Sequence, residues 1–176
     1  SPRLAPFKKG AFHLAMQAQV PMVPVVIRNA GEIMPARSVL VYEGTVQVAV
    51  LPPVDTSRWT AKSMDRQVTR VRKMFLDTLA ERTFDFFWEL SDPETGLSPD
   101  RAPTASFASI AAVGFALTAY PIGVARGWIT REQARDRALS TLRFFHDAPQ
   151  GPEATGVAGY KGFFYHFLDM ASGPRF

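Results

Sequence analysis

The chain has 176 residues, contains no cysteine and carries a formal net charge of +4 at pH 7. Its hydrophobic content of 47% is typical of a folded protein and excludes a disordered tail. The absence of cysteine excludes a disulfide framework and a thiolate metal site.

The charge is unevenly distributed along the chain. Residues 1–80 hold 11 Lys and Arg against 5 Asp and Glu, whereas residues 81–176 hold 9 against 11. A basic first part suits an anionic phosphate or a membrane surface. The alternative is that Arg66, Arg70, Arg72 and Lys73 only solvate one face of a helix. Nucleic acid is a weak third option, because the sequence holds no RNA- or DNA-binding motif.

The first part of the chain predicts the closing half of an α/β domain. A short amphipathic helix is expected over residues 8–19, and the apolar, β-branched run over 20–27 predicts a strand buried on both faces of a parallel or mixed sheet. Residues 38–50 predict two β-rich stretches around a turn at Glu43-Gly44. Apolar residues spaced three and four apart then predict a long helix, as in the closing half of an α/β domain.

The second part predicts helices and loops without strands. The long helix is expected to stop at the turn-rich residues 91–100, and a second helix is expected over 104–120, ending before Pro121. A third helix begins at the capping-box pattern that opens with Thr130. We therefore expect strands only before about residue 52 and helices only after about residue 60.

A membrane span is an alternative interpretation of residues 103–125, because this stretch carries no charged side chain. Pro121, Gly114, Gly123 and several Ser and Thr residues dilute its hydrophobicity. Small-residue helices also pack closely in helical barrels of soluble proteins, and we favour that interpretation.

Two strings in the first part resemble the 1-acyl-glycerol-3-phosphate acyltransferases. They are LAPFKKGAFHLAMQAQVPMVPVVIRNA over residues 4–30 and EGTVQVAVLPPVDTSRW over residues 43–59. The resemblance implies acyl transfer from acyl-CoA or acyl-carrier protein to 1-acyl-glycerol-3-phosphate. In that family a His-x-x-x-x-Asp pair activates the acceptor hydroxyl.

The histidines of this chain do not fit that pair, because His13, His146 and His166 are followed five positions later by Ala, Gly and Ala. No catalytic residue is therefore assigned. Contact with the substrate phosphate is predicted at Lys8, Lys9 and Gly10, because ammonium groups and the free N–H groups of a helix start favour an anion. The alternative is an exposed Lys pair at a helix end.

Three strings in the second part resemble the N-terminal region of bacterial glucoamylase-like proteins and endo-β-1,2-glucanases. They are RTFDFFWELSDPETGLSPDR over residues 82–101, SFASIAAVGFALTAYPIGVARGWITREQARDRALSTLRFF over 106–145 and GPEATGVAGYKGFFYHFLDM over 151–170. The resemblance implies an (α/α) toroid around a cleft lined by aromatic and acidic residues.

The same resemblance guides the choice of candidate site residues. Glycoside hydrolysis needs two carboxylates, but Asp100, Glu153 and Asp169 are not assigned as catalytic. Aromatic faces stack on pyranose rings, and basic groups donate to sugar hydroxyls. The predicted glycan-binding residues are Arg101, Tyr160, Lys161, Phe163, Tyr165 and His166. The alternative is that Phe163, Phe164 and Phe167 belong to an ordinary core.

The two resemblances predict two parts, residues 1–80 and 81–176, in a mixed α+β chain: a partial α/β domain followed by an all-α partial (α/α) toroid. We expect a fragment of a glycerolipid acyltransferase joined to a fragment of a glucan-degrading hydrolase, inactive as it stands. The alternatives are a non-catalytic glucan-binding module and an intact-length parent that is a β-1,2-glucanase or glucoamylase-like enzyme. Because the chain opens with Ser1-Pro2-Arg3, we also expect further sequence upstream.

The expected partners follow from the two resemblances. They are a lysophospholipid with its acyl donor for the first part and a glucan for the second, without cofactor, metal ion or nucleic acid. The acyltransferase resemblance implies a cytoplasmic location at the inner membrane face, with peripheral membrane contact through the basic first part. The glucanase resemblance implies the periplasm or export.

Overall fold

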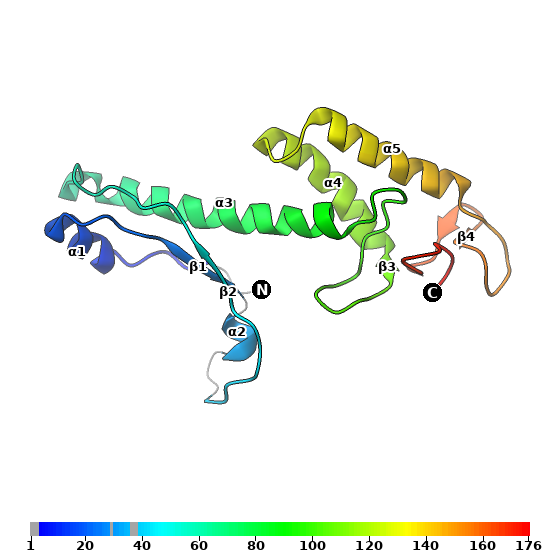
Figure 1. The fold of residues 1–176 in the computed structure, drawn as a ribbon, viewed down its shortest axis with the longest axis horizontal. Helices are drawn as coiled ribbons and strands as arrows, with labels where there is room; N and C mark the ends of the chain where they lie inside the picture. Colours follow the sequence, from blue (N-terminus) through cyan, green and yellow to red (C-terminus); the bar gives the residue numbers. More distant parts are fainter. Residues whose placement is uncertain (1–3, 29, 36–38) are drawn as a thin grey trace. The chain divides into compact units, whose positions relative to one another are not determined.

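The structure, a computed structural model, describes residues 4–28, 30–35 and 39–176. It divides into two compact units, Ser1–Leu79 and Ala80–Phe176. The predicted mixture of helices and strands is confirmed. Figure 1 traces the elements of both units along the chain.

The first unit holds most of its helical residues in two helices and has one small sheet (Figure 1). Its elements are α1 (Gly10–Ala18), β1 (Val25–Arg28), α2 (Ala30–Ile33), β2 (Gln47–Val50), the 3₁₀ turn η1 (Ala61–Ser63) and the beginning of α3 (Met64–Leu90).

Helix α1, predicted over residues 8–19, packs its buried Phe12 on Trp59, with ring centroids 6.0 Å apart. The helix ends at Gln19, whose left-handed backbone lets its N–H donate to carbonyls of the last turn. The chain continues with Val20, whose carbonyl oxygen accepts a hydrogen bond from the buried hydroxyl of Thr56 at 2.8 Å. The predicted helix is confirmed.

Strand β1 pairs antiparallel with β2, from Val25 opposite Val50 to Arg28 opposite Gln47. The prediction of a strand buried on both faces in a parallel or mixed sheet is wrong, because Val26 is the buried residue of β1. The other residues of β1 are exposed, and the two described strands of this sheet run antiparallel.

The predicted turn at Glu43-Gly44 does not join two paired strands. Of the stretch 38–50, residue 38 lies outside the described residues, 39–46 are irregular and 47–50 form β2. Alternating valines predict a strand, but they do not specify the partner, and here the partner is β1.

The second unit holds the end of α3, followed by α4 (Ile110–Arg126) and α5 (Arg131–Asp147). A core formed by Phe84, Ala116, Tyr120 and Ile129 packs these helices together. The predicted capping box starts α5: the Thr130 hydroxyl accepts from the Gln133 N–H at 3.2 Å, and the Gln133 side-chain oxygen accepts from the Thr130 N–H at 2.8 Å.

Helix α4 begins and ends later than predicted, because it starts at Ile110 and runs through Pro121. A proline inside a helix removes one N–H donor and its ring clashes with the preceding turn, at a cost of about 3 kcal/mol or more. Tyr120 and Gly123 on either side of it are buried, so packing outweighs that cost. The helix then stops at Gly127, whose backbone is left-handed at φ 73°.

The prediction of helices alone after residue 60 is wrong. Strand β3 (Ala108–Ser109) pairs with β6 (Phe167–Leu168), and β4 (Gly159–Tyr160) pairs with β5 (Phe163–Phe164). Each strand has two residues, which is too short for a period-two pattern to appear in the sequence. The β3 and β6 pair also joins segments nearly sixty residues apart and lies beside a core of Leu97, Ala108, Ala158 and Leu168.

The membrane-span alternative for residues 103–125 finds no support in the structure. Among the helices of the described residues, none combines the length and the apolar character that crossing a bilayer requires.

Two glycines of α4 predict opposite effects on stability. A Cβ on Gly114 would meet nothing within 4 Å, whereas a Cβ on Gly123 would lie 2.4 Å from the Phe84 ring. Gly114→Ala is expected to raise the free energy of unfolding by about 0.5–1 kcal/mol, because alanine favours the helix. Gly123→Ala gains the same helix propensity but must displace the buried Phe84 ring. We therefore expect it to lower the free energy of unfolding, as measured by urea denaturation. An equal effect of the two substitutions would contradict this close approach.

Candidate functional site

The predicted phosphate-binding residues lie together at the amino end of α1. Lys8, Lys9 and Gly10 are exposed, and Lys9 is the N-cap residue without a side-chain cap bond. A Cβ on Gly10 would meet nothing within 4 Å, so space is open in front of the first turn. The first backbone N–H groups of the helix, the positive end of its dipole and two exposed lysines therefore lie together at this end of α1.

Lys9 already has a carboxylate partner. Its ammonium group lies 2.5 Å from Asp65 at the start of α3, with half of the lysine side chain and 81% of the aspartate side chain exposed. An exposed ion pair contributes between 0 and about 1 kcal/mol, so an incoming phosphate could displace Asp65 at small cost. The pair positions the Lys9 side chain and weakens its field at the same time.

Part of the basic run in α3 has structural contacts. The Arg72 guanidinium donates to the Leu4 carbonyl oxygen at 3.1 Å and ties the first described residues to the helix. Lys73 forms an ion pair with Asp77 one turn further along α3. Lys73 therefore fits the alternative of a charge on a solvated helix face, whereas Arg72 makes a contact within the fold.

The six predicted glycan-binding residues fall into three groups in the second unit. Tyr160, Lys161 and Phe163 form the tip of the β4–β5 hairpin, where Tyr160 and Phe163 are directly opposite each other. Their side chains are 42% and 80% exposed. Directly paired residues project from the same face of a sheet, so the two rings form one exposed surface, the hairpin-tip surface. The alternative of an ordinary core residue is wrong for Phe163, whereas Phe164 packs against the core of the second unit.

The hairpin turn places Lys161 in an unusual backbone conformation. Lys161 and Gly162 have φ angles of 52° and 85°, as a two-residue type I′ turn requires. A non-glycine residue in this region costs on the order of 1–2 kcal/mol, and Asn or Gly usually occupies it. The Lys161 ammonium lies 5.1 Å from the centroid of the Tyr160 ring, within the range of a cation–π contact.

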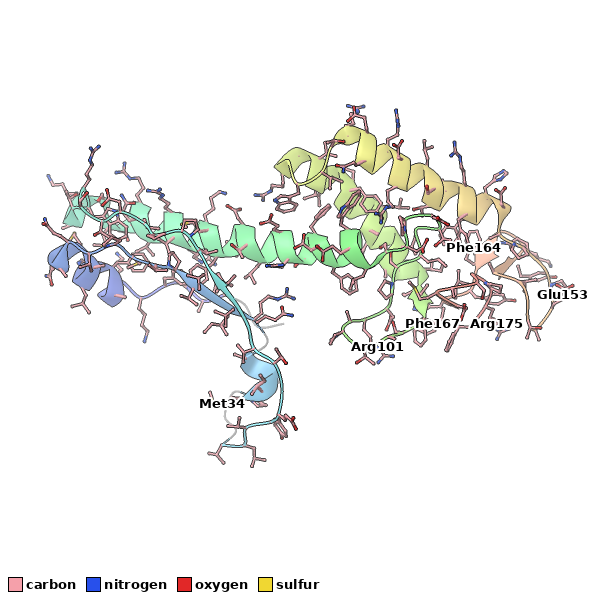
Figure 2. All side chains as sticks on the ribbon, in the orientation of Figure 1. Met34, Arg101, Glu153, Phe164, Phe167 and Arg175 are labelled. Carbon is pink, nitrogen blue, oxygen red and sulfur yellow. The ribbon has the colours of Figure 1, made fainter. Side chains whose placement is uncertain are left out.

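Arg101 and His166 belong to a second aromatic cluster. The Arg101 guanidinium lies 5.8 Å from the Phe107 ring centroid, and that ring lies 4.1 Å from Phe167. His166 packs edge-on against Phe167 at 4.3 Å. Phe176 completes the cluster at 5.0 Å from Phe107. Figure 2 labels Arg101 and Phe167, which come from the loop before β3 and from β6.

Tyr165 forms the third group and is half-buried beneath Arg175, whose guanidinium lies 4.7 Å from its ring centroid. It also packs against the core of the second unit. Sequence reasoning missed Phe107 and Phe176, because contacts across sixty residues or more leave no local signal, and it also missed Arg175. For the hairpin, the sequence did carry a signal, because Gly162 stands between the aromatic residues Tyr160 and Phe163 and favours a tight turn.

Asp169, one of the three acidic candidates, holds a loop together. Its Oδ1 accepts hydrogen bonds from the Ser172 hydroxyl and from the N–H groups of Ser172 and Ala171 at 2.7–3.0 Å. These bonds, the Ser172 hydroxyl foremost, lower the pKa of the Asp169 carboxyl. A carboxylate with this many donors is stabilised as an anion and is a poor proton donor to a leaving group.

Asp100 and Glu153 show no arrangement of paired acids. Asp100 lies 3.8 Å from the neighbouring Arg101, and Figure 2 places Glu153 on the loop between α5 and β4. Within the described residues there is no group of three or more His, Asp or Glu side chains that could hold a metal ion.

Comparisons with known proteins match the two parts of the chain separately. A family model described as Acyltransferase matches residues 1–28. The 1-acyl-sn-glycerol-3-phosphate acyltransferase of Saccharomyces cerevisiae is 37% identical over 78 residues, covering 44% of this chain and 26% of that protein. The human alpha enzyme is 40% identical over 82 residues (47% and 29%), and the human beta enzyme 50% over 58 residues (33% and 21%).

The solved structures that match are of a different kind. A putative glucoamylase from Bacteroides uniformis has 31% sequence identity and a TM-score of 0.48, covering 55% of this chain and 22% of that one. An endo-β-1,2-glucanase from Chitinophaga pinensis, in complex with sophorotriose and glucose, has 24% identity, a TM-score of 0.45 and coverage of 55% and 23%.

Both resemblances predicted from the motifs are confirmed. The chain spans about a quarter of the length of the curated relatives it matches.

Proposed function

We propose that residues 1–79 hold the acceptor phosphate in an acyltransferase acting on 1-acyl-glycerol-3-phosphate. The observation that carries this proposal is the exposed amino end of α1, where Lys8, Lys9 and the first turn of the helix lie together in a segment similar to such enzymes. A phosphomonoester carries two negative charges near neutral pH and suits that surface. The same basic surface is the part of the chain that we propose for peripheral membrane contact.

We propose further that the 176 residues bind this acceptor without transferring an acyl group to it. The acceptor hydroxyl needs a general base, and a histidine with an orienting carboxylate is the arrangement expected for this chemistry. His13 lies within α1, but its sequence position offers no Asp at the required spacing.

A second candidate function is carbohydrate binding by the second unit. Two exposed rings lie opposite each other at the hairpin tip, and the lysine between them is held in a costly backbone conformation. Backbone strain of this kind is found where a side chain is positioned for a ligand. We propose that the rings stack on pyranose faces and that Lys161 donates to sugar hydroxyls, with α4 and α5 as one helix pair of a partial (α/α) toroid.

The phosphate site predicts opposite effects of two charge-removing substitutions. Asp65→Asn releases Lys9 and is expected to tighten binding of glycerol 3-phosphate two- to fivefold at low salt, as for a surface pair worth up to about 1 kcal/mol. Lys8→Ala should weaken it by a similar factor. Titration followed by the amide NMR shifts of α1 measures the affinity for glycerol 3-phosphate and shows whether it binds at this helix. Asp77→Asn removes the same charge from the pair with Lys73 and is the control; equal gains in both variants would sink the proposed site.

Acyl transfer is expected to be absent from the 176-residue chain. Loss of an activating base with its partner costs on the order of a million-fold in rate. The assay follows transfer from acyl-CoA to 1-acyl-glycerol-3-phosphate. Protein-dependent transfer that His13→Ala abolishes would overturn this expectation.

The hairpin-tip surface predicts that Phe163→Ala reduces retardation of the protein in gels containing β-1,2-glucan without lowering stability. The ring is 80% exposed, so its removal leaves no cavity. Lys161→Asn should also reduce retardation, while raising the free energy of unfolding by up to about 1 kcal/mol, because Asn tolerates the turn. The control is Leu142→Ala, which removes an exposed apolar side chain from α5. Unchanged retardation in both hairpin variants would refute the proposal.

A further inference from the structure

One face of the β1–β2 sheet carries only apolar side chains. Val25 lies directly opposite Val50, and Ile27 lies directly opposite Val48. Directly paired residues project from the same face of a sheet, and so do residues two positions apart along a strand, which adds Val23 and Val46. This surface, the outer sheet face, therefore consists of Val23, Val25, Ile27, Val46, Val48 and Val50.

The outer sheet face is exposed although it is apolar. Its six residues are between 40% and 69% exposed. The opposite face holds Val26, which is buried, and Ala49, which is half-buried. The two polar residues of the strands, Arg28 and Gln47, lie opposite each other and belong to that second face. A sheet face that meets water usually carries polar residues, so this distribution indicates that a partner covers the outer sheet face.

The exposed area of this face is sufficient for a pair of copies. The six exposed fractions correspond to about 500 Å² per copy, in the upper part of the range for the largest apolar patch on a monomer. Two such faces in contact would bury about 1,000 Å², which is roughly the lower limit for a specific interface between proteins. The exposed residues Pro21 and Pro52 extend the face at one end and add to this area.

Charge favours a second copy as the partner. Residues 1–80 hold 11 Lys and Arg against 5 Asp and Glu, so most contacts between two first units would bring like charges together. The outer sheet face brings no charged side chain into such a contact, and its apolar surface matches that of an identical face. A nucleic acid or an acidic peptide would instead need cations on this face.

The sheet edges argue against a lipid bilayer as the partner. Among the described residues this sheet consists of β1 and β2, so each strand has an outer edge of backbone N–H and C=O groups. The hydrocarbon layer of a membrane offers these groups no hydrogen bonds, and open sheet edges are not found in it. At a protein interface the edges stay in contact with water while the face is buried.

We propose that two copies of the chain dock through the outer sheet face, as a two-fold symmetric dimer in which the two sheets pack face to face. Aligned sheets pack about 10 Å apart with their inner side chains interdigitated, and β-branched residues suit such a surface. A two-stranded sheet is marginally stable alone, so the second sheet also supports the first. The inference goes beyond the functions proposed above, because neither the amino end of α1 nor the hairpin tip contributes a residue to this face.

The test is sedimentation equilibrium of the full 176-residue chain over a concentration series. The expected mass rises with concentration to twice the 19.5 kDa of one chain. Val48→Lys places an ammonium group on each of the two apposed faces and should weaken association by at least about tenfold. The control is Leu142→Lys on α5, which adds the same charge at a residue that is 58% exposed, against 56% for Val48, and should leave association unchanged.

Circular dichroism checks the fold of each variant. Val48→Thr keeps the β-branched shape and removes apolar surface, so it replaces Val48→Lys if the lysine variant does not fold. Because the chain contains no cysteine, single-cysteine variants report the contact directly. Oxidation should give a covalent dimer with Ile27→Cys or Val48→Cys and not with Leu142→Cys.

Three results would each overturn the proposal: a monomer at every concentration, association that Val48→Lys leaves unchanged, and crosslinking that is as efficient through position 142 as through the sheet. A monomer that sediments with phospholipid vesicles would identify a bilayer as the partner instead. Binding of glycerol 3-phosphate should persist in Val48→Lys, so loss of the dimer and loss of the site at α1 are separate readouts.

Discussion

The carbonyl groups at the end of α3 have to be satisfied, and Arg137 of α5 satisfies two of them. Its guanidinium donates to the Ser91 and Trp88 carbonyl oxygens at 3.1 and 3.3 Å and lies 4.4 Å from the Trp88 ring centroid. A cation at a helix carboxyl end is favoured by the helix dipole. Because Arg137 stands in the second turn of α5, the contact joins the end of α3, the following loop and α5.

The loop after α3 depends on the same cation. Burial works against ionisation of Asp92, but hydrogen bonds from Thr95 and Glu94, aided by Arg137, outweigh it and lower the pKa of that carboxyl. Gly96 then passes so close to Thr141 of α5 that a Cβ would lie 1.9 Å from its hydroxyl oxygen. The loop leads to Leu97 and Ser98, both fully buried, and so brings the chain into the core that β3 and β6 complete.

Local patterns predicted the helices of this chain well and its strands poorly. The capping box at Thr130 and the apolar stripe of α3 are signals within one or two turns, so the sequence alone identifies them. The pairing of β3 with β6 depends on a contact between distant segments, and Pro121 remains helical because its neighbours are buried. At Pro121, burial of the neighbouring residues outweighed the rule that proline ends a helix. For β3 and β6, the separation of the two strands along the chain left no local pattern to detect.

The candidate sites were predictable to the same extent. Neighbours in sequence, such as Lys8 with Lys9 and Tyr160 with Phe163, remain neighbours in space. Asp65 as the partner of Lys9 could not be predicted, because the two lie more than fifty residues apart. That partner changes the chemistry, since an anion must compete with a carboxylate before it gains the second lysine. At the hairpin tip Lys161 lies over the Tyr160 ring, and the Tyr160 and Phe163 rings are exposed to solvent. The two surfaces therefore differ in the ligand that they favour. At α1 an anion must replace the Asp65 carboxylate, whereas at the hairpin an apolar face stacks on exposed rings.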